Sequence, residues 1–208
     1  HTTFNGLGVL AVLPFSSAFA RLMTRLVPER GLDLSARLDP ALLKDPAAAF
    51  GWFETTARQG YTEGMNSLAR AYLYGEGVAA SDNDAFQWYQ RSAVEKESAV
   101  GQAMLGWMYE NGRGTNPDID KALSWYRLAA KQDHLWSLKA LGRIYAEGVA
   151  VEVDRPKSCY WYEKAAEEGD GFSRVQVGYC YAYGWGRKAD QVQAVDFFVQ
   201  AVNRDTAE

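Results

Sequence analysis

The 208-residue sequence predicts an all-α fold, an α-solenoid in which antiparallel helix pairs stack into a right-handed superhelix. Two observations predict it. Pairs of aromatic residues recur along the chain at steps of 36 or 37 residues, and a Leu-Gly-x-x-Tyr motif followed by a glycine-containing turn keeps the same period. Self-similarity at this period is typical of repeat proteins built from helical hairpins.

The first helix of each unit is predicted from the Leu-Gly-x-x-Tyr motif, which begins at Leu68, Leu105, Leu141 and Val177. Its apolar residues lie four apart, and the small second residue allows a neighbouring helix to approach closely. The glycine that follows each motif favours a positive φ and ends the helix. These glycines are Gly75, Gly112, Gly148 and Gly184.

The second helix of each unit begins at a capping residue seven positions before the aromatic pair. The caps are Asp45, Ser81, Asp118, Asp154 and Asp190. The aromatic pairs are Trp52-Phe53, Trp88-Tyr89, Trp125-Tyr126, Trp161-Tyr162 and Phe197-Phe198. Large aromatic side chains packed against alanines fill the interface between two helices without voids.

The chain therefore divides into a segment at 1–44 and a repeat domain at 45–208. We expect a half repeat at 45–60 and four full repeats. The full repeats span about 61–97, 98–133, 134–169 and 170–205.

The segment at 1–44 has two interpretations. Residues 6–20 are uncharged and end in Ala18-Phe19-Ala20, which resembles a secretory signal peptide without its basic region and is too short to span a bilayer. This interpretation predicts a periplasmic or secreted protein, whereas otherwise we expect a cytoplasmic one. The alternative is a structural cap, a helix over 18–27 that carries one apolar face. That face consists of Phe19, Leu22, Met23 and Leu26.

Composition argues against several functions. The net charge of −4 is spread evenly, so we expect no nucleic-acid partner. Two cysteines and two histidines supply no four-cysteine zinc site, and the sequence lacks the glycine-rich phosphate loops and the HExxH motif. His134, the only internal histidine, is expected to be a surface or packing residue rather than a general base. We therefore predict neither an enzyme nor a metal or cofactor site.

Cys159 and Cys180 lie 21 residues apart and form no CxxC motif. A disulfide bond would form in an oxidising compartment, but two free buried thiols are the preferred interpretation at this point.

The sequence around Asp118, Lys121-Ala122, Trp125-Tyr126 and Ala129-Ala130 resembles the Sel1-like repeat, a relative of the tetratricopeptide repeat, and points to a bacterial member of that family. The resemblance extends over about residues 45–202. It implies a scaffold, adaptor, regulator or inhibitor that holds a protein partner on its concave face. The disulfide-rich members of this family place their cysteines at other spacings, so the resemblance does not imply a bond here.

The predicted binding face follows from a helical wheel counted from the tyrosine of each first helix. Positions −8, −4, −3 and 0 form the core stripe, and positions −9, −6, −2 and +2 lie opposite. Aromatic and basic side chains on that opposite face have the composition of a protein-binding hot spot, with Trp107 and Tyr179 at its centre. The predicted partner-binding residues are Arg70, Tyr74, Trp107, Trp136, Lys139, Arg143, Phe172, Tyr179, Tyr183 and Trp185.

Several alternatives stay open. Residues at −9 and +2 could instead pack beneath the preceding repeat and the turn, and Trp185 could cap the last repeat. The protein could serve as an immunity or inhibitor protein of a secreted effector, or as an envelope regulator or adaptor. A carbohydrate-binding or hydrolytic protein that uses the same aromatic groove is the alternative class, but the carboxylates expected there, Glu63 and Glu147, are two repeats apart. The sequence indicates no oligomeric state.

Overall fold

The computed structural model describes residues 45–148 and 150–205, with side chains as far as residue 202, and regular structure in these ranges is entirely helical. Both interpretations of the segment at 1–44 lie outside the described residues. The helices are α4 (Pro46–Arg58), α5 (Thr62–Tyr74), α6 (Asp82–Glu95), α7 (Ala99–Asn111), α8 (Ile119–Ala130), α9 (Leu135–Glu147), α10 (Arg155–Glu167), α11 (Gly171–Tyr183) and α12 (Gln191–Asp205).

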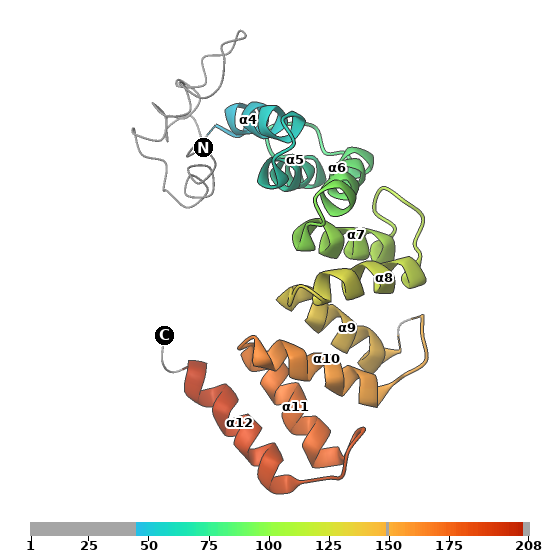
Figure 1. The fold of residues 1–208 in the computed structure, drawn as a ribbon, viewed down its shortest axis with the longest axis vertical. Helices are drawn as coiled ribbons and strands as arrows, with labels where there is room; N and C mark the ends of the chain where they lie inside the picture. Colours follow the sequence, from blue (N-terminus) through green and yellow to red (C-terminus); the bar gives the residue numbers. More distant parts are fainter. Residues whose placement is uncertain (1–44, 149, 206–208) are drawn as a thin grey trace, which may run out of the picture. The chain divides into compact units, whose positions relative to one another are not determined.

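The chain forms two compact units, one ending at Ala85 and one beginning at Phe86. In the first unit α4 packs against α5, and the ring of Phe50 meets the ring of Tyr72 edge-on at 5.4 Å between centroids. In the second unit the pairs α7–α8, α9–α10 and α11–α12 follow one another, with α8 packed on α9 and α10 packed on α11 (Figure 1). The predicted fold class, an all-α repeat solenoid, is confirmed.

The predicted caps and turns begin and end these helices. Side-chain oxygens of Asp118 and Asp154 each accept a hydrogen bond, at 3.0 Å, from the backbone N–H three residues on. Ser81 and Asp190 cap their helices in the same way, and Asp45 accepts its hydrogen bond from the backbone N–H of Ala47, two residues on. The four turn glycines all lie in the left-handed region, with φ between 65° and 73°.

The small residue after the leucine permits the predicted close approach of the second helix. A Cβ added to Gly106 would lie 2.6 Å from the ring of Tyr126, and one added to Gly142 would lie 2.9 Å from the ring of Tyr162. Both tyrosines belong to the predicted aromatic pairs and are buried. The second unit thus has a core of leucine, isoleucine, alanine and tyrosine side chains that includes Leu138, Leu141 and Ile144.

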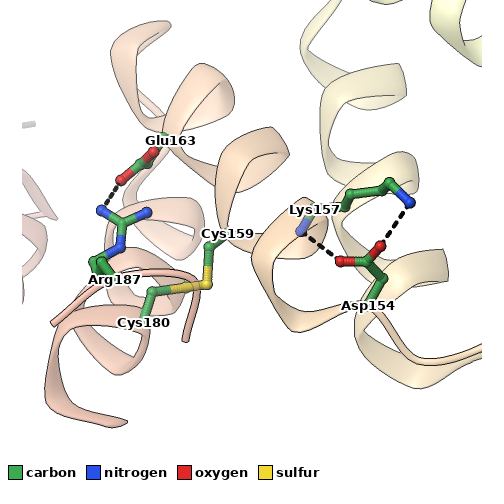
Figure 2. The surroundings of a disulfide bond; sticks show 6 residues. All are labelled: Asp154, Lys157, Cys159, Glu163, Cys180 and Arg187. Atoms are coloured by element: carbon green, nitrogen blue, oxygen red, sulfur yellow. Dashed lines mark hydrogen bonds and ion pairs between the residues drawn. A yellow bond between two sulfur atoms is a disulfide. The ribbon is translucent and has the colours of Figure 1, made fainter. Parts of the chain in front are cut away.

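Cys159 of α10 and Cys180 of α11 form a disulfide bond, with 5.9 Å between their Cα atoms (Figure 2). The preference for free thiols was therefore wrong. Cys159 lies near the start of α10 and Cys180 near the end of α11, and because these consecutive helices run antiparallel, the two positions face each other. Nearby, Arg187 in the segment after α11 forms an ion pair with Glu163 of α10 (Figure 2). The bond and the ion pair together fasten the last helix pair to the preceding one.

Candidate functional site

The predicted core stripe of the first helices is confirmed by burial. Positions −8, −4 and −3 are buried in α5, α7, α9 and α11, and the tyrosine at position 0 is buried or half-buried. The opposite positions are exposed or half-buried, apart from Ala103 of α7, which is 1% exposed. The alternative in which position −9 packs against the preceding repeat is right in part, because Trp136 and Phe172 each contact a tyrosine of that repeat. At position +2, Tyr74 and Tyr183 are exposed. Trp136 and Phe172, both at −9, expose 40% and 53% of their surface.

A groove of about 520 Å³ runs across the first helices α7, α9 and α11 of the second unit. Tyrosines of the second helices α8 and α10 also reach it. Its lining consists of Trp107, Glu110, Asn111, Tyr126, Trp136, Lys139, Ala140, Arg143, Glu147, Tyr162 and Phe172. Five of the ten predicted binding residues meet in this groove. These five are Trp107, Trp136, Lys139, Arg143 and Phe172.

Arg143 joins two carboxylates in the groove. Its guanidinium forms one ion pair with Glu110 of the preceding repeat and another with Glu147 one turn further along α9, at 3.2 Å. Glu110 also accepts a hydrogen bond from the Tyr126 hydroxyl, at 2.7 Å. Burial and the nearby Glu110 carboxylate raise the pKa of Tyr126, so this phenol stays a hydrogen-bond donor. The arginine is thus held by two carboxylates, and one of these, Glu110, is itself held by the buried Tyr126 of α8.

Lys139 has a fixed partner as well. Its ammonium lies 2.8 Å from a carboxylate oxygen of Asp170, and 5.4 Å from the centre of the Phe172 ring. Asp170 caps α11 by accepting hydrogen bonds from the backbone N–H and the hydroxyl of Ser173, at 2.8 and 2.6 Å. Burial opposes ionisation of Asp170, but the hydrogen bonds from Lys139 and Ser173 outweigh it, and its pKa is lowered.

The two exposed aromatic side chains of the groove rest on buried tyrosines. Trp136 meets Tyr126 edge-on at 5.8 Å between ring centroids, and Phe172 meets Tyr162 in the same way at 6.0 Å. Edge-to-face contacts of this kind favour one ring orientation. The Trp136 and Phe172 rings are therefore held in place, as are the charged side chains of the groove.

Five segments of the chain match the Sel1 repeat, at residues 38–61, 62–93, 99–134, 137–170 and 173–205. The chain belongs to the Sel1 repeat family. Among solved Sel1-type structures, the chain is similar to the protective antigen c5321 of uropathogenic Escherichia coli, with a TM-score of 0.76, 26% identity and coverage of 90% of this chain and 38% of that one. A Sel1 repeat protein from Oxalobacter formigenes gives a TM-score of 0.70 and 29% identity, over 77% of this chain and 46% of that one.

Two curated relatives share Sel1-type sequence over a shorter stretch. Chitin synthase regulatory factor 3 of Schizosaccharomyces pombe is 33% identical over 91 residues, and chitin synthase regulator SKT5 of Saccharomyces cerevisiae is 32% identical over 89 residues. These stretches cover 43% and 42% of this chain, but only 10% and 13% of the relatives. The chain thus spans a small part of the length of the fungal regulators that it matches.

Not every predicted site residue of this Sel1 repeat protein lies in the groove. Tyr179 and Tyr183 form a separate stack with Trp185, and the Arg155 guanidinium lies 4.5 Å from the centre of the Trp185 ring. Arg70 and Tyr74 belong to the first unit, where Arg70 pairs with Glu76. Five of the ten predicted residues therefore lie outside the lining of this groove.

Trp107 differs from its prediction in one respect. We expected its side chain to point away from the core, but it is half-buried and packs against the core cluster around Leu141. The reason is that position −2 of one Sel1 repeat lies beside the first helix of the next repeat. Trp107 is both a groove residue and a packing residue.

Sequence reasoning missed Glu110, Tyr126 and Tyr162 as groove residues. The expectation that Glu63 and Glu147 are the only acidic candidates was wrong, because Glu110 lines the groove together with Glu147. Glu110 directly follows the motif tyrosine, at position +1, between the wheel positions assigned to the two faces. Only the neighbouring Arg143 and Tyr126, which reach across from other helices, turn it into the groove.

The described residues were searched for groups of side chains that could hold a metal ion. Among these residues there is no cluster of three metal-ligating side chains. His134 is half-buried at the start of α9, 3.1 Å from the Ser137 hydroxyl, and burial lowers its pKa. Within the same ranges, no helix has both the length and the apolar character needed to cross a membrane.

Proposed function

We propose that this Sel1 repeat protein binds a protein partner through the groove of its second unit, on the concave face of the solenoid. The observation that carries the proposal is a pre-paired arginine, Arg143, surrounded by exposed aromatic side chains. Arginine and large aromatic residues carry more interface energy than other residue types.

The groove is suited to a partner that inserts an apolar or aromatic side chain. Trp136 and Phe172 present ring surface that is already oriented by Tyr126 and Tyr162. The cationic groups of the groove are also held by partners within the protein, so binding would require little ordering of side chains. Because each cation has a carboxylate partner, the groove offers no net positive surface for a nucleic acid.

The role that we favour is that of a regulator or adaptor which holds an enzyme or a component of an envelope complex. The names of the fungal relatives support this, since those proteins are regulators of chitin synthase. An immunity or inhibitor protein of a secreted effector would use the same groove to block its target. The two roles differ in whether the partner loses its activity when it is bound.

We further propose that the protein works in the periplasm or outside the cell. The Cys159–Cys180 bond supports this, because disulfides persist in oxidising compartments and are rare in the cytosol. In a cytoplasmic setting these two cysteines would be kept reduced. Alkylation of the native protein from its own cells, without reductant, would distinguish the two settings, since only free thiols react.

A carbohydrate ligand is the second candidate, and the presence of both Glu110 and Glu147 beside aromatic rings favours it. A hydrolase needs one carboxyl group that gives up a proton and a second that attacks or activates water. Here both carboxylates are ion-paired with the same Arg143 guanidinium. This pairing favours sugar binding over sugar hydrolysis within this class.

The test uses two variants that leave the core intact. Trp136→Ala with Phe172→Ala removes the exposed rings of the groove, and Val94→Ala with Tyr160→Ala removes exposed apolar side chains elsewhere. A protein retained from a source lysate by the wild type and by the control, but not by the groove variant, would support the proposal. Equal retention by all three would contradict it. Retention of an oligosaccharide, but of no protein, would establish the second candidate.

A further inference from the structure

The groove of the second unit has two chemically different ends. Trp136 and Phe172 are each the second residue of their helix and lie at the N-terminal ends of α9 and α11. Glu110 and Glu147 lie in the last turns of α7 and α9, which hold no basic residue. Since the first helices of successive repeats point in the same direction, the groove has an aromatic end at Trp136 and Phe172 and an acidic end at Glu110 and Glu147.

The two carboxylates of the acidic end differ in how firmly they are held. The side chain of Glu110 is 12% exposed and is bound by both Arg143 and the Tyr126 hydroxyl. The side chain of Glu147 is 53% exposed, and its ion-pair partner among the described residues is the same Arg143 guanidinium. One guanidinium thus serves two carboxylates, and about half of the Glu147 side chain stays accessible in the groove.

The helix ends add to the negative charge at the acidic end. Backbone carbonyl groups in the last turns of α7 and α9 carry partial negative charge, which favours a cation there. The Tyr162 phenol, which lines the groove, responds to this field, because burial raises its pKa and the Glu147 carboxylate raises it further, although Arg143 lowers it. Arg113, in the turn after α7, lies 5.7 Å from the centre of the Trp107 ring and outside the groove lining. The acidic end therefore offers a place for one more cation.

The groove offers no equivalent place for an anion. Lys139 is paired with Asp170 at 2.8 Å, and Arg143 is paired with two glutamates. In these pairs three carboxylates face two cations, so one negative charge remains. A basic side chain would continue the alternation of charges that runs from Glu110 through Arg143 to Glu147. An acidic side chain would instead bring a fourth carboxylate.

We propose that the partner presents an extended, basic segment to this groove. A lysine or arginine side chain of the segment pairs with Glu147 at the acidic end, and an aromatic or large apolar side chain packs on Trp136 and Phe172 at the aromatic end. The inference rests on the proposed function and adds the chemistry of the partner at the same groove. Ammonium and guanidinium groups donate charge-assisted hydrogen bonds to carboxylates, and these are stronger than hydrogen bonds between neutral groups.

The length of α9 sets the spacing of the two side chains in the partner. Trp136 and Glu147 are about three helical turns apart in α9, which places them on one side of the helix at about 16 Å along its axis. An extended segment covers about 3.3 Å per residue. The basic and the aromatic residue of the partner should therefore be separated by about five positions.

The first test selects ligands from random peptides displayed on phage, each long enough to span the groove, with the unreduced protein as bait. We expect the wild type to enrich peptides that carry a lysine or arginine about five positions from an aromatic residue. Glu147→Gln should keep the aromatic preference and lose the basic one. The matched control is Glu95→Gln, because Glu95 pairs with Arg91 of α6 in the same i,i+4 arrangement at 3.1 Å, with 47% of its side chain exposed. This control should select the same peptides as the wild type.

The outcomes separate this inference from the proposed function. Trp136→Ala with Phe172→Ala should abolish the selection. If that variant enriches the same peptides as the wild type, or if the wild type enriches none, the proposed function fails and this inference fails with it. If the selection depends on the two rings but shows no basic preference, or an acidic one, the proposed function stands and this inference is overturned.

The second test measures the affinity of one enriched peptide by fluorescence anisotropy. Replacing its basic residue by norleucine removes the charge and should weaken binding to the wild type by about tenfold, the usual loss for a hydrogen bond to a charged group. Against Glu147→Gln the same replacement should change the dissociation constant by less than about twofold, because the two groups act on each other. Equal losses against both proteins would mean that the basic side chain binds elsewhere and would overturn the proposal. Thermal melting followed by circular dichroism verifies that all variants are folded.

Discussion

The hydroxyl of Tyr126 donates a hydrogen bond to Glu110 across 2.7 Å, and this bond joins the buried core of one helix pair to the charged side of the groove. Tyr126 is fully buried, whereas Glu110 reaches Arg143 of the next repeat. The charged side chains of the groove are therefore positioned by residues of the core. Substitutions in the core beneath the groove should change how Glu110 and Arg143 are held.

Tyr126→Phe tests this link. It should leave one oxygen of Glu110 without its donor and lower the free energy of unfolding by about 1–3 kcal/mol, the usual cost of a half-satisfied buried hydrogen bond. Urea denaturation measures the change. Tyr160→Phe, on an exposed ring of α10, is the control and should be neutral. An unchanged stability for Tyr126→Phe would mean that water replaces the phenol without loss.

The disulfide bond should contribute substantially to the second unit. Closing a loop of 21 residues stabilises a fold by about 3 kcal/mol on the chain-entropy estimate. We expect reductant to lower the melting temperature of the wild type, and Cys159→Ala with Cys180→Ala to melt at the reduced value whether or not reductant is present. Free thiols titrated in the unreduced, denatured protein would show instead that the bond does not form.

The close approach at Gly142 predicts a large effect from a single methyl group. Its added Cβ would lie 2.9 Å from the Tyr162 ring, so Gly142→Ala should push the second helix away and cost about 1–3 kcal/mol by overpacking. Gln87→Ala, on the exposed side of α6, adds no such contact and serves as the control. A gain in stability from Gly142→Ala, as expected for alanine in an ordinary helix, would contradict this account.

The repeat architecture could be predicted from the sequence because its landmarks are local. The caps at Asp118 and Asp154 and the turns at Gly112 and Gly184 act within a few residues of their own position. Each of these residues therefore has the same local effect in every repeat. The wheel likewise predicted that Trp136 would be exposed.

The contacts between neighbouring repeats could not be predicted in this way. The bond between Cys159 and Cys180 depends on the distance between the packed helices α10 and α11. The orientation of Glu110 toward the groove depends on Arg143 of the next repeat. A helical wheel drawn for one helix gives no information about the helices that pack against it. For the same reason, Trp107 was expected to lie away from the core.

The pH dependence of stability should include a part that belongs to Asp170. Its pKa is lowered in the folded protein, so the folded state binds fewer protons than the unfolded one in this range. The stabilisation is thus fully present above about pH 4, the ordinary pKa of aspartate, and is lost as the pH falls through the lower, folded value. Melting temperatures from neutral to acidic pH should fall more steeply for the wild type than for Asp170→Asn. Asp196→Asn, on the exposed side of α12, is the control, and parallel curves for wild type and Asp170→Asn would contradict the assignment.

The groove itself is tested by comparing two tryptophans that differ in burial. Trp136 is an exposed ring on a tyrosine, so Trp136→Ala should weaken a protein complex by about 2 kcal/mol, roughly 30-fold in dissociation constant, while changing stability little. Trp107 packs on the core as well, so Trp107→Ala should weaken the complex and also lower the melting temperature. Affinity is measured by calorimetry with the captured partner, and stability by thermal denaturation of the free protein. If Trp136→Ala leaves affinity unchanged, the partner binds elsewhere, and the stack of Tyr179, Tyr183 and Trp185 becomes the next surface to truncate.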